Sequence, residues 1–287
     1  MDTIGSQKIW SYFDREPECR IAGNAAIREG RGHRVKNYLE LASKIADLQF
    51  RNHDHVLLFR GQGGDYRNRR GNSSLKPTLF RPAKAGNPDR ATLVERFGRL
   101  SRAEQILVAH YKAAGHVVGF NRLRRHRILR WSILQHYEVC ATPLLDVTHS
   151  IRIAASFASL SGADLAFVYV LGVPNLSGAI TASAEAGLQI VRLASVCPPS
   201  AVRPHIQEGY LLGVYPEVAE YAEKENYFHH EMDFGRRLVA KFCFKPSSFW
   251  KSNKFPQVAK RALYPSPKAD EFYELALAVQ EELGSPV

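Results

Sequence analysis

The sequence predicts an α+β protein whose N-terminal half is mainly helical. Long segments with apolar residues at helical spacing occupy the first half of the chain. Short apolar runs rich in β-branched and aromatic residues gather in the second half and indicate buried strands. This grouping of helices and strands indicates the α+β class.

Each expected element rests on its local pattern of apolar, breaker and turn residues. In the first half we expect a helix at 35–50, a strand at 55–59 that ends at Arg60, a loop at 67–90, a helix at 91–115 with a break at Gly98, and a helix at 122–139. In the second half we expect a strand at 143–148, a helix at 150–160, a central strand at 165–173, strands at 188–196, 208–215 and 237–246, and an amphipathic helix at 268–283.

The composition is that of an ordinary globular protein with a basic balance. The 287 residues are 45% hydrophobic and 23% charged, and the formal net charge is +11. No apolar run approaches the ~20 residues of a membrane helix, and no secretory signal is expected at the N-terminus. The four cysteines are scattered without a CxxC pair, which argues against a zinc ribbon or a disulfide framework. We therefore expect a cytoplasmic protein without a membrane partner, and the positive charge favours an anionic partner or only aids solubility.

The stretch "HVLLFRGQGGDY" places a guanidinium directly after an apolar strand. Arg60 offers five donors in a rigid fork that suits phosphate or ribose oxygens. Gly61, Gly63 and Gly64 would let a ligand or a second backbone come close. Arg60 is therefore a candidate ligand contact, and a structural ion pair at a turn is the alternative.

Two further stretches concentrate polar side chains. Residues 135–158 interleave apolar residues with His136, Tyr137, Thr142, Asp146 and Thr148. These can line a site or be hydrogen-bonded core residues, and Asp146 can cap the next helix or orient a neighbour.

Residues 202–210 carry Arg203, Gln207 and Glu208. Glu208 is the carboxylate of this stretch and a candidate acid, base or charge stabiliser, although a surface turn explains it equally well. In a strand, Gln207 and Glu208 would face opposite sides, so only one could line a cleft.

Other sequence signals are weaker or missing. Basic runs at 67–70 and 122–130 can hold phosphates or be solvated faces. The motifs GxSxG, HExxH, GxxxxGK[ST] and a ribose-binding GxGxxG are missing, which argues against a serine hydrolase, a zinc protease and a P-loop enzyme.

Five ordered stretches resemble the FRG domain, a bacterial and phage family named for Phe-Arg-Gly. They are "FRGQ" at 59–62, "LKPTLFRP" at 75–82, "QHYEVCATPLLDVTHSIRIAASFA" at 135–158, "RPHIQEGY" at 203–210 and "RALYPSPKADEF" at 261–272. The resemblance implies an N-terminal extension at 1–34 and an FRG-type domain at 35–287. Departures from the family pattern are Glu138 for Gly, Pro143 for Arg, Val147 for Trp and Tyr210 for Phe.

At a more distant level the layout resembles the ADP-ribosyltransferase fold with its split β core. By that analogy NAD is the substrate. Arg60, Gly61, Gln62, His136, Thr142, Asp146, Thr148 and Arg203 would contact it, and Gln207, Glu208 and Tyr137 would act in catalysis.

The sequence thus supports two classes of function. One is an NAD-binding ADP-ribosyltransferase-like protein, either a transferase with a nucleic acid or protein acceptor or an NAD-cleaving toxin of phage defence. The other is a non-catalytic nucleotide- or nucleic-acid-binding sensor or interaction module. Asp146 is expected to be a supporting residue, and Gln207 rather than Glu208 is expected to contact the ligand.

Overall fold

The structure, a computed structural model, describes residue 4 and residues 7–82, 87–115, 118–225, 232–252 and 254–284. The described helices are α1 (Asn24–Glu29), α2 (Tyr38–Arg51), α3 (Arg90–Ala114), α4 (Phe120–Arg125), α5 (Arg127–His136), α6 (Ile151–Ser159), α7 (Leu193–Val196), α8 (Val202–Ile206), α9 (Tyr221–Glu225), α10 (Pro246–Phe249), α11 (Lys260–Leu263) and α12 (Glu271–Leu283). The described strands are β1 (Ile9–Ser11), β2 (Arg20–Ala22), β3 (His33–Arg34), β4 (Val56–Gln62), β5 (Leu145–Thr148), β6 (Ala166–Val173), β7 (Ile180–Ser183), β8 (Leu188–Arg192), β9 (Gly209–Val214) and β10 (Leu238–Phe244).

An eight-stranded mixed sheet forms the centre of the described chain. Its strand order is β3-β10-β6-β4-β5-β9-β8-β7. The β3–β10 pair is parallel, whereas every other neighbouring pair is antiparallel. A separate antiparallel pair joins β1 and β2. The predicted mixture of helices and strands is therefore confirmed.

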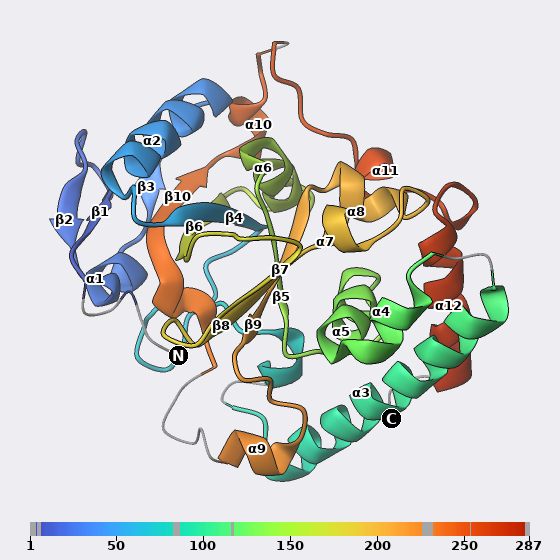
Figure 1. Ribbon diagram of the computed structural model, residues 1–287. Helices are drawn as coiled ribbons and strands as arrows, with labels where there is room; N and C mark the ends of the chain where they lie inside the picture. Colours follow the sequence, from blue (N-terminus) through green and yellow to red (C-terminus); the bar gives the residue numbers. More distant parts are fainter. Residues whose placement is uncertain are drawn as a thin grey trace.

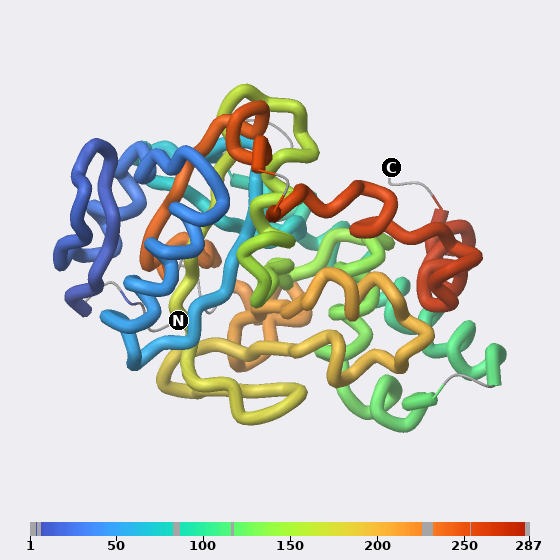
Figure 2. The backbone as a smooth tube through the Cα atoms, turned by 90° about the horizontal axis from the view of Figure 1, so that it is seen from above, coloured from blue at the N-terminus to red at the C-terminus, as the bar shows by residue number. Residues whose placement is uncertain are grey.

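The two ends of the molecule are built from different parts of the chain. Figures 1 and 2 show β1, β2, α1 and α2 at one end, and α3, α4 and α12 at the other. The N-terminal segment is tied into the sheet, because β3 pairs with β10 and the Asn24 side-chain amide donates to the carbonyls of Gly235 and Leu238. The predicted domain boundary after residue 34 falls directly after β3, and it stays a prediction.

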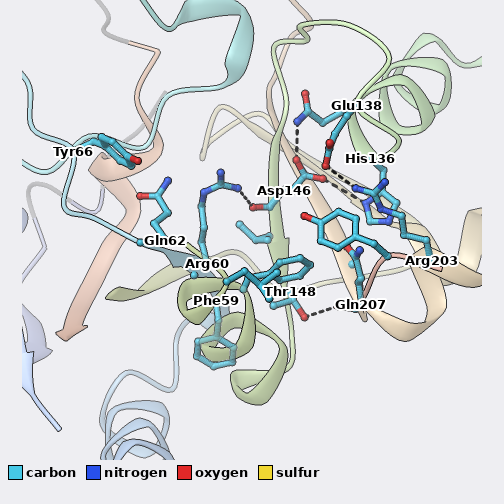
Figure 3. Close-up of a pocket in the computed structure, with 18 of the residues that line it drawn as sticks. Phe59, Arg60, Gln62, Tyr66, His136, Glu138, Asp146, Thr148, Arg203 and Gln207 are labelled. Atoms are coloured by element: carbon cyan, nitrogen blue, oxygen red, sulfur yellow. Dashed lines mark hydrogen bonds and ion pairs between the residues drawn. The ribbon is translucent and has the colours of Figure 1, made fainter. Parts of the chain in front are cut away.

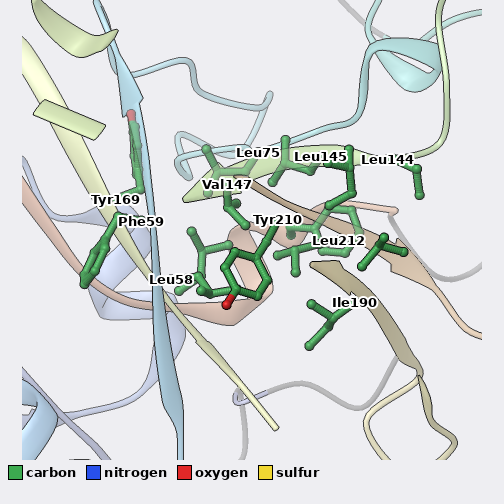
Figure 4. Packing of buried hydrophobic residues seen from close by; sticks show 14 of the residues in the cluster. Leu58, Phe59, Leu75, Leu144, Leu145, Val147, Tyr169, Ile190, Tyr210 and Leu212 are labelled. Carbon is green, nitrogen blue, oxygen red and sulfur yellow. The ribbon is translucent and has the colours of Figure 1, made fainter. Parts of the chain in front are cut away.

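The core lies along the middle strands of the sheet. All eight residues of β6 and all seven of β10 are buried, and both sequences are apolar except for Lys241 of β10, whose Nζ contacts Asp65 at 2.8 Å. Figure 4 shows Leu58 of β4 beside Val147 of β5 and Tyr210 of β9. Strands from both halves of the sheet thus share one core, which fixes β4 and β5 relative to each other.

The strand expected at 188–196 ends at Arg192, because residues 193–196 form α7, and three further differences from the sequence-based expectation stand out. The strand β4 continues past Arg60, because Gly61 and Gln62 pair with Val168 and Phe167 of β6. The helix α3 runs unbroken through the exposed Gly98.

The third difference is that residues 122–139 form two helices, α4 and α5, with extended backbone at His126. Arg130 donates to the carbonyls of Leu123 and Arg124 at the end of α4, which compensates the helical hydrogen bonds lost at the break.

No described helix is long and apolar enough to cross a membrane. All four cysteines are free thiols.

Candidate functional site

The sheet divides between β4 and β5, and a pocket opens at the division. These strands share a single register pair, Phe59 with Thr148, whereas β4 pairs with β6 along its whole length. Beyond Phe59 the two strands separate and enclose a cavity of about 370 Å³. This volume lies within the ~300–1,000 Å³ of small-molecule sites.

Residues from both sides of the division line the cavity. They are Phe59, Arg60, Gly61, Gln62, Gly63, Tyr66, Arg81, Gln135, His136, Glu138, Asp146, Val147, Thr148, Phe157, Leu160, Arg203, Gln207, Gly209 and Tyr264. Eight of the eleven site residues expected from the sequence line this pocket, and Tyr137, Thr142 and Glu208 do not. Gly61, however, has a packing role that is described below.

Strand alternation directs Arg60 and Gln62 into the pocket. Figure 3 shows both side chains on one side of β4 and Phe59 on the other. Arg60 Nη1 donates to the backbone carbonyl of Asp146 at 2.5 Å, across the division. Arg60 therefore bridges two strands and forms no ion pair among the described residues, which excludes the structural ion pair considered from the sequence.

The charge environment of Arg60 is unusual. Burial lowers the pKa of Arg60 to about 10, the nearby Arg81 lowers it further, and Asp146 opposes the shift. Partial desolvation also lowers the pKa of Arg81, an otherwise exposed residue whose Nε donates to the carbonyl of Lys76. The Arg81 guanidinium therefore adds to the positive charge around Arg60, Asp146 offsets part of it, and a bound anion would be favoured there.

Gly61 and Gly63 make room for protein rather than ligand. A Cβ atom on Gly61 would lie 1.8 Å from the carbonyl oxygen of Ala154 in α6. A Cβ atom on Gly63 would lie 2.1 Å from Ser161 Oγ. A second backbone approaches Gly61 and a side chain approaches Gly63, and because Gly61 also lines the pocket, its contact with a ligand stays a prediction.

Asp146 lies in β5 and is held by two polar side chains. Gln135 Nε2 donates to its Oδ2 at 2.7 Å, and His136 Nδ1 lies 3.4 Å from its Oδ1. Burial opposes ionisation, but these hydrogen bonds and the charge of Arg60 outweigh it and lower the Asp146 pKa. The prediction that Asp146 caps the next helix is wrong, because the Ser150 side chain caps α6.

His136 is a buried, neutral imidazole. Burial lowers its pKa, which Asp146 only partly offsets. The contact with Asp146 assigns the ring proton to Nδ1, and Nε2 has no hydrogen-bond partner among the described residues.

Arg203 and Glu138 form the opposite end of the pocket. Arg203 is buried, and its Nη2 donates to Glu138 Oε1 at 2.7 Å. The guanidinium also lies over the ring of Tyr264, at 4.6 Å from the ring centroid. Glu138 has a left-handed backbone with φ 59°, and its side chain is 66% exposed. The structure thus explains why the family usually has Gly here.

Tyr137 and Thr142, like Glu208, do not line the pocket although they were expected in the site. The Tyr137 hydroxyl donates to Asp270 at 2.9 Å within the core, and this contact and burial raise its pKa. The Thr142 hydroxyl donates to Gln135 Oε1 at 2.5 Å. The assignment of Tyr137 to catalysis and of Thr142 to ligand binding is therefore corrected, because both hydroxyls are buried and engaged elsewhere.

The stretch 202–208 is not a strand, so its expected alternation does not hold. Gln207 ends α8 and lines the pocket, and its Nε2 donates to the carbonyl of Leu263 at 2.7 Å. The Thr148 hydroxyl donates to the Gln207 carbonyl at 2.8 Å. Glu208 follows with φ 46°, is exposed and does not line the pocket. The assignment of Glu208 to catalysis is corrected, because the turn directs it to solvent.

The sequence analysis missed several lining residues. Arg81 and Gln135 lie in two of the stretches that resemble the FRG domain, but neither side chain was predicted to line a site. Glu138 was noted only as a departure from the family pattern. Tyr66 ends the stretch that contains Arg60, and Tyr264 lies in the family-like stretch at 261–272, but neither was singled out as a site residue.

The basic run at 122–130 divides into two groups. Arg127 and Arg130 contact Glu104 at 3.6 and 3.4 Å. Arg122, Arg124 and Arg125 are exposed. The first group is structural, and the second remains available to an anionic partner.

Several polar atoms of the pocket have no hydrogen-bond partner. Of the seven such buried side-chain atoms in the described residues, four belong to pocket residues, namely Arg60 Nε, Gln62 Oε1, His136 Nε2 and Arg203 Nε. Each unsatisfied group costs about 1–3 kcal/mol, so a ligand that supplies both donors and acceptors would be favoured. Among the described residues, no group of three or more His, Cys, Asp or Glu side chains is placed to hold a metal ion.

Comparisons with known proteins give one match. The model of the FRG domain matches residues 55–164. A search of curated proteins and a search of solved structures find no match. The matched range contains β4, α5, β5 and α6, whereas Arg203, Gln207 and Tyr264 complete the pocket from outside it. The "FRGQ" strand, the residues that hold Asp146 and the helix that packs on Gly61 all fall within the range that is similar to the FRG domain.

Proposed function

We propose that the pocket binds NAD and that the protein is an ADP-ribosyltransferase-like enzyme that cleaves the nicotinamide–ribose bond. The observation that carries the proposal is the pair Arg60 and Arg81, two guanidinium groups at the division of the sheet that form no ion pair with the described residues. A diphosphate is the ligand group that best matches two such cations.

The charge pattern of the pocket matches the two ends of NAD. Figure 3 shows Arg60 and Gln62 on one side of Asp146, and Glu138, His136 and Arg203 on the other. NAD carries a negative diphosphate at its centre and a positive nicotinamide ring at one end. With the diphosphate at Arg60 and Arg81, the nicotinamide ribose would extend toward the two carboxylates.

The unsatisfied atoms support a ligand with hydroxyl and amide groups. The lone pair on His136 Nε2 and the amide oxygen of Gln62 can accept hydrogen bonds, and the Arg60 and Arg203 Nε atoms can donate. Ribose hydroxyls and a carboxamide offer both kinds of partner. The arrangement also resembles the ADP-ribosyltransferase layout in sequence order, with Arg60 on β4, β5 opposite it, and Gln207 at the start of β9.

A second function is favoured by one observation. Glu208 is exposed and does not line the pocket, so the segment 202–208 supplies the amide of Gln207 and no carboxylate. A non-catalytic module that binds a nucleotide as a sensor would need no such carboxylate.

The test measures NAD binding by calorimetry and nicotinamide release by chromatography on the same protein. The Arg60→Ala variant should weaken NAD binding about 10- to 100-fold, because a charge-assisted hydrogen bond contributes about 1.5–3 kcal/mol. Arg102→Ala removes an exposed arginine of α3 that does not line the pocket and is the matched control. Release of nicotinamide by the wild type favours the enzyme, and binding without release favours the sensor. No NAD binding by the wild type would refute the proposal.

A further inference from the structure

Three carboxylates are candidates to stabilise the positively charged transition state of nicotinamide release. They are Asp146 and Glu138, which line the pocket, and Glu208, which does not. A preorganised negative charge next to the developing charge is the largest contribution a site of this kind can make. The structure distinguishes the three by their partners and their access to the cavity.

Asp146 is committed to the protein. Both of its carboxylate oxygens have side-chain partners, Gln135 and His136. Its backbone carbonyl accepts from Arg60. A ligand that used this carboxylate would compete with contacts that hold α5 against β5.

Glu138 is held at one oxygen and open at the other. Its Oε1 accepts from Arg203, whereas its Oε2 has no hydrogen bond among the described residues. The side chain is 66% exposed although it lines the cavity, so a ligand can reach it without displacing protein contacts. Arg203 cannot swing away easily, because it is buried and its guanidinium lies over Tyr264 and Tyr137.

The backbone gives a second, independent reason to single out Glu138. Its φ of 59° is a conformation that glycine adopts without strain and that other residues adopt at a cost. A non-glycine residue in this conformation at a pocket wall is a known sign of a functional constraint. A glycine here would leave Arg203 without its carboxylate partner.

We infer that Glu138 is the catalytic carboxylate of this pocket and that it stabilises the positive charge on the ribose of NAD. This inference rests on the proposed function. In the step, the bond between ribose C1′ and the nicotinamide nitrogen breaks, and its electron pair leaves with neutral nicotinamide. The C1′ carbon is then attacked by the oxygen of water or of an acceptor hydroxyl, whose proton passes to solvent. Glu138 remains unchanged, with Arg203 fixing its position.

The test compares Glu138→Gln with Glu208→Gln. Both parents are glutamates with left-handed backbone at the ends of helical segments, but only Glu138 lines the pocket. For Glu138→Gln, kcat for nicotinamide release should fall about 100-fold, and the Kd for NAD should not increase, because the lost charge acts in the transition state. Glu208→Gln should keep the wild-type kcat. A third variant, Glu138→Gly, relieves the backbone and should remain folded with the same loss of kcat.

The outcomes separate this inference from the proposed function. Equal kcat for Glu138→Gln and wild type would overturn the inference, as would an equal loss in Glu208→Gln. A wild-type protein that binds NAD but releases no nicotinamide would also overturn it, while leaving NAD binding intact. A wild-type protein that does not bind NAD would overturn the proposed function itself.

Discussion

Among the described glycines, Gly61 is the one at which an added Cβ atom would lie closest to another atom. This residue stands on the face of β4 opposite Arg60 and packs against the backbone of α6. An added Cβ would lie 1.8 Å from the Ala154 carbonyl oxygen and 2.8 Å from the Ala158 nitrogen. Neither atom can rotate away, because both belong to the helix backbone.

The cost of Gly61→Ala follows from this distance. Non-bonded heavy atoms rest about 3.5 Å apart, so α6 would have to withdraw by roughly 1.5 Å. Overpacking of a rigid core costs about 1–3 kcal/mol, and we expect about 3 kcal/mol because the clash is between backbones. The melting temperature should then fall by about 6 °C or more for a chain of this size.

Two other glycines provide matched controls. Gly64→Ala places its Cβ no closer than 4.0 Å to any atom, the Tyr66 ring being nearest, and should be close to neutral. Gly98→Ala meets nothing within 4 Å on the exposed side of α3 and should stabilise the protein by about 0.5–1 kcal/mol. Thermal unfolding followed by circular dichroism measures all three. A melting temperature of Gly61→Ala equal to that of the wild type would refute the packing described for α6.

Two further predictions concern residues outside the pocket. Tyr137→Phe should destabilise the fold by about 1–3 kcal/mol in urea unfolding, because Asp270 loses a buried donor, and should leave NAD binding unchanged; a selective loss of binding would return Tyr137 to the site. Asp65 contacts Lys241 at 2.8 Å, and although burial raises the Asp65 pKa, this contact lowers it overall. The Asp65–Lys241 contact therefore stabilises the folded state fully above the ordinary Asp pKa of about 4. This stabilisation is lost as the pH falls through the lowered pKa that Asp65 has in the folded protein. Asp65→Asn should be less stable than wild type at pH 7, and the difference should shrink below about pH 4; a constant difference across this range would contradict the assignment.

The strands of the fold were predictable wherever burial dictates composition. Residues 166–173 are apolar because every residue of β6 is buried, so both faces of this central strand are covered. The end of β4 was missed because glycine and glutamine have no strand preference of their own. Their strand conformation comes from hydrogen bonds to β6, which is about a hundred residues further along the chain.

The site was predictable as a set of positions but not as a set of roles. The stretch 135–148 contains pocket residues and core residues side by side, and their sequence neighbours do not separate them. The Tyr137 hydroxyl donates to Asp270 in the core, outside the pocket. The Gln207 side-chain amide donates to the carbonyl of Leu263. Both partners lie far along the chain, so no local pattern could reveal which hydroxyl or amide would be engaged.

Glu208 shows how a short helix changes a site. A strand through residues 203–210 would have placed Gln207 and Glu208 on opposite faces, with one face toward the cleft. The chain instead closes one helical turn at α8, and a left-handed residue follows before β9 begins. The Gln207 side chain is thereby buried against Leu263, and the carboxylate turns to solvent.

Arg60 has both a structural role, as a bridge between β4 and β5, and the ligand-binding role proposed for the pocket. Where β4 and β5 separate, the Asp146 carbonyl is no longer paired with the backbone of β4. The guanidinium of Arg60 supplies the missing donor at 2.5 Å and thereby spans the gap. This contact uses Nη1 and leaves Nε without a partner among the described residues. The structural contact and the ligand contact are therefore made by different atoms of one side chain, so a supporting role for Arg60 is no evidence against a binding role.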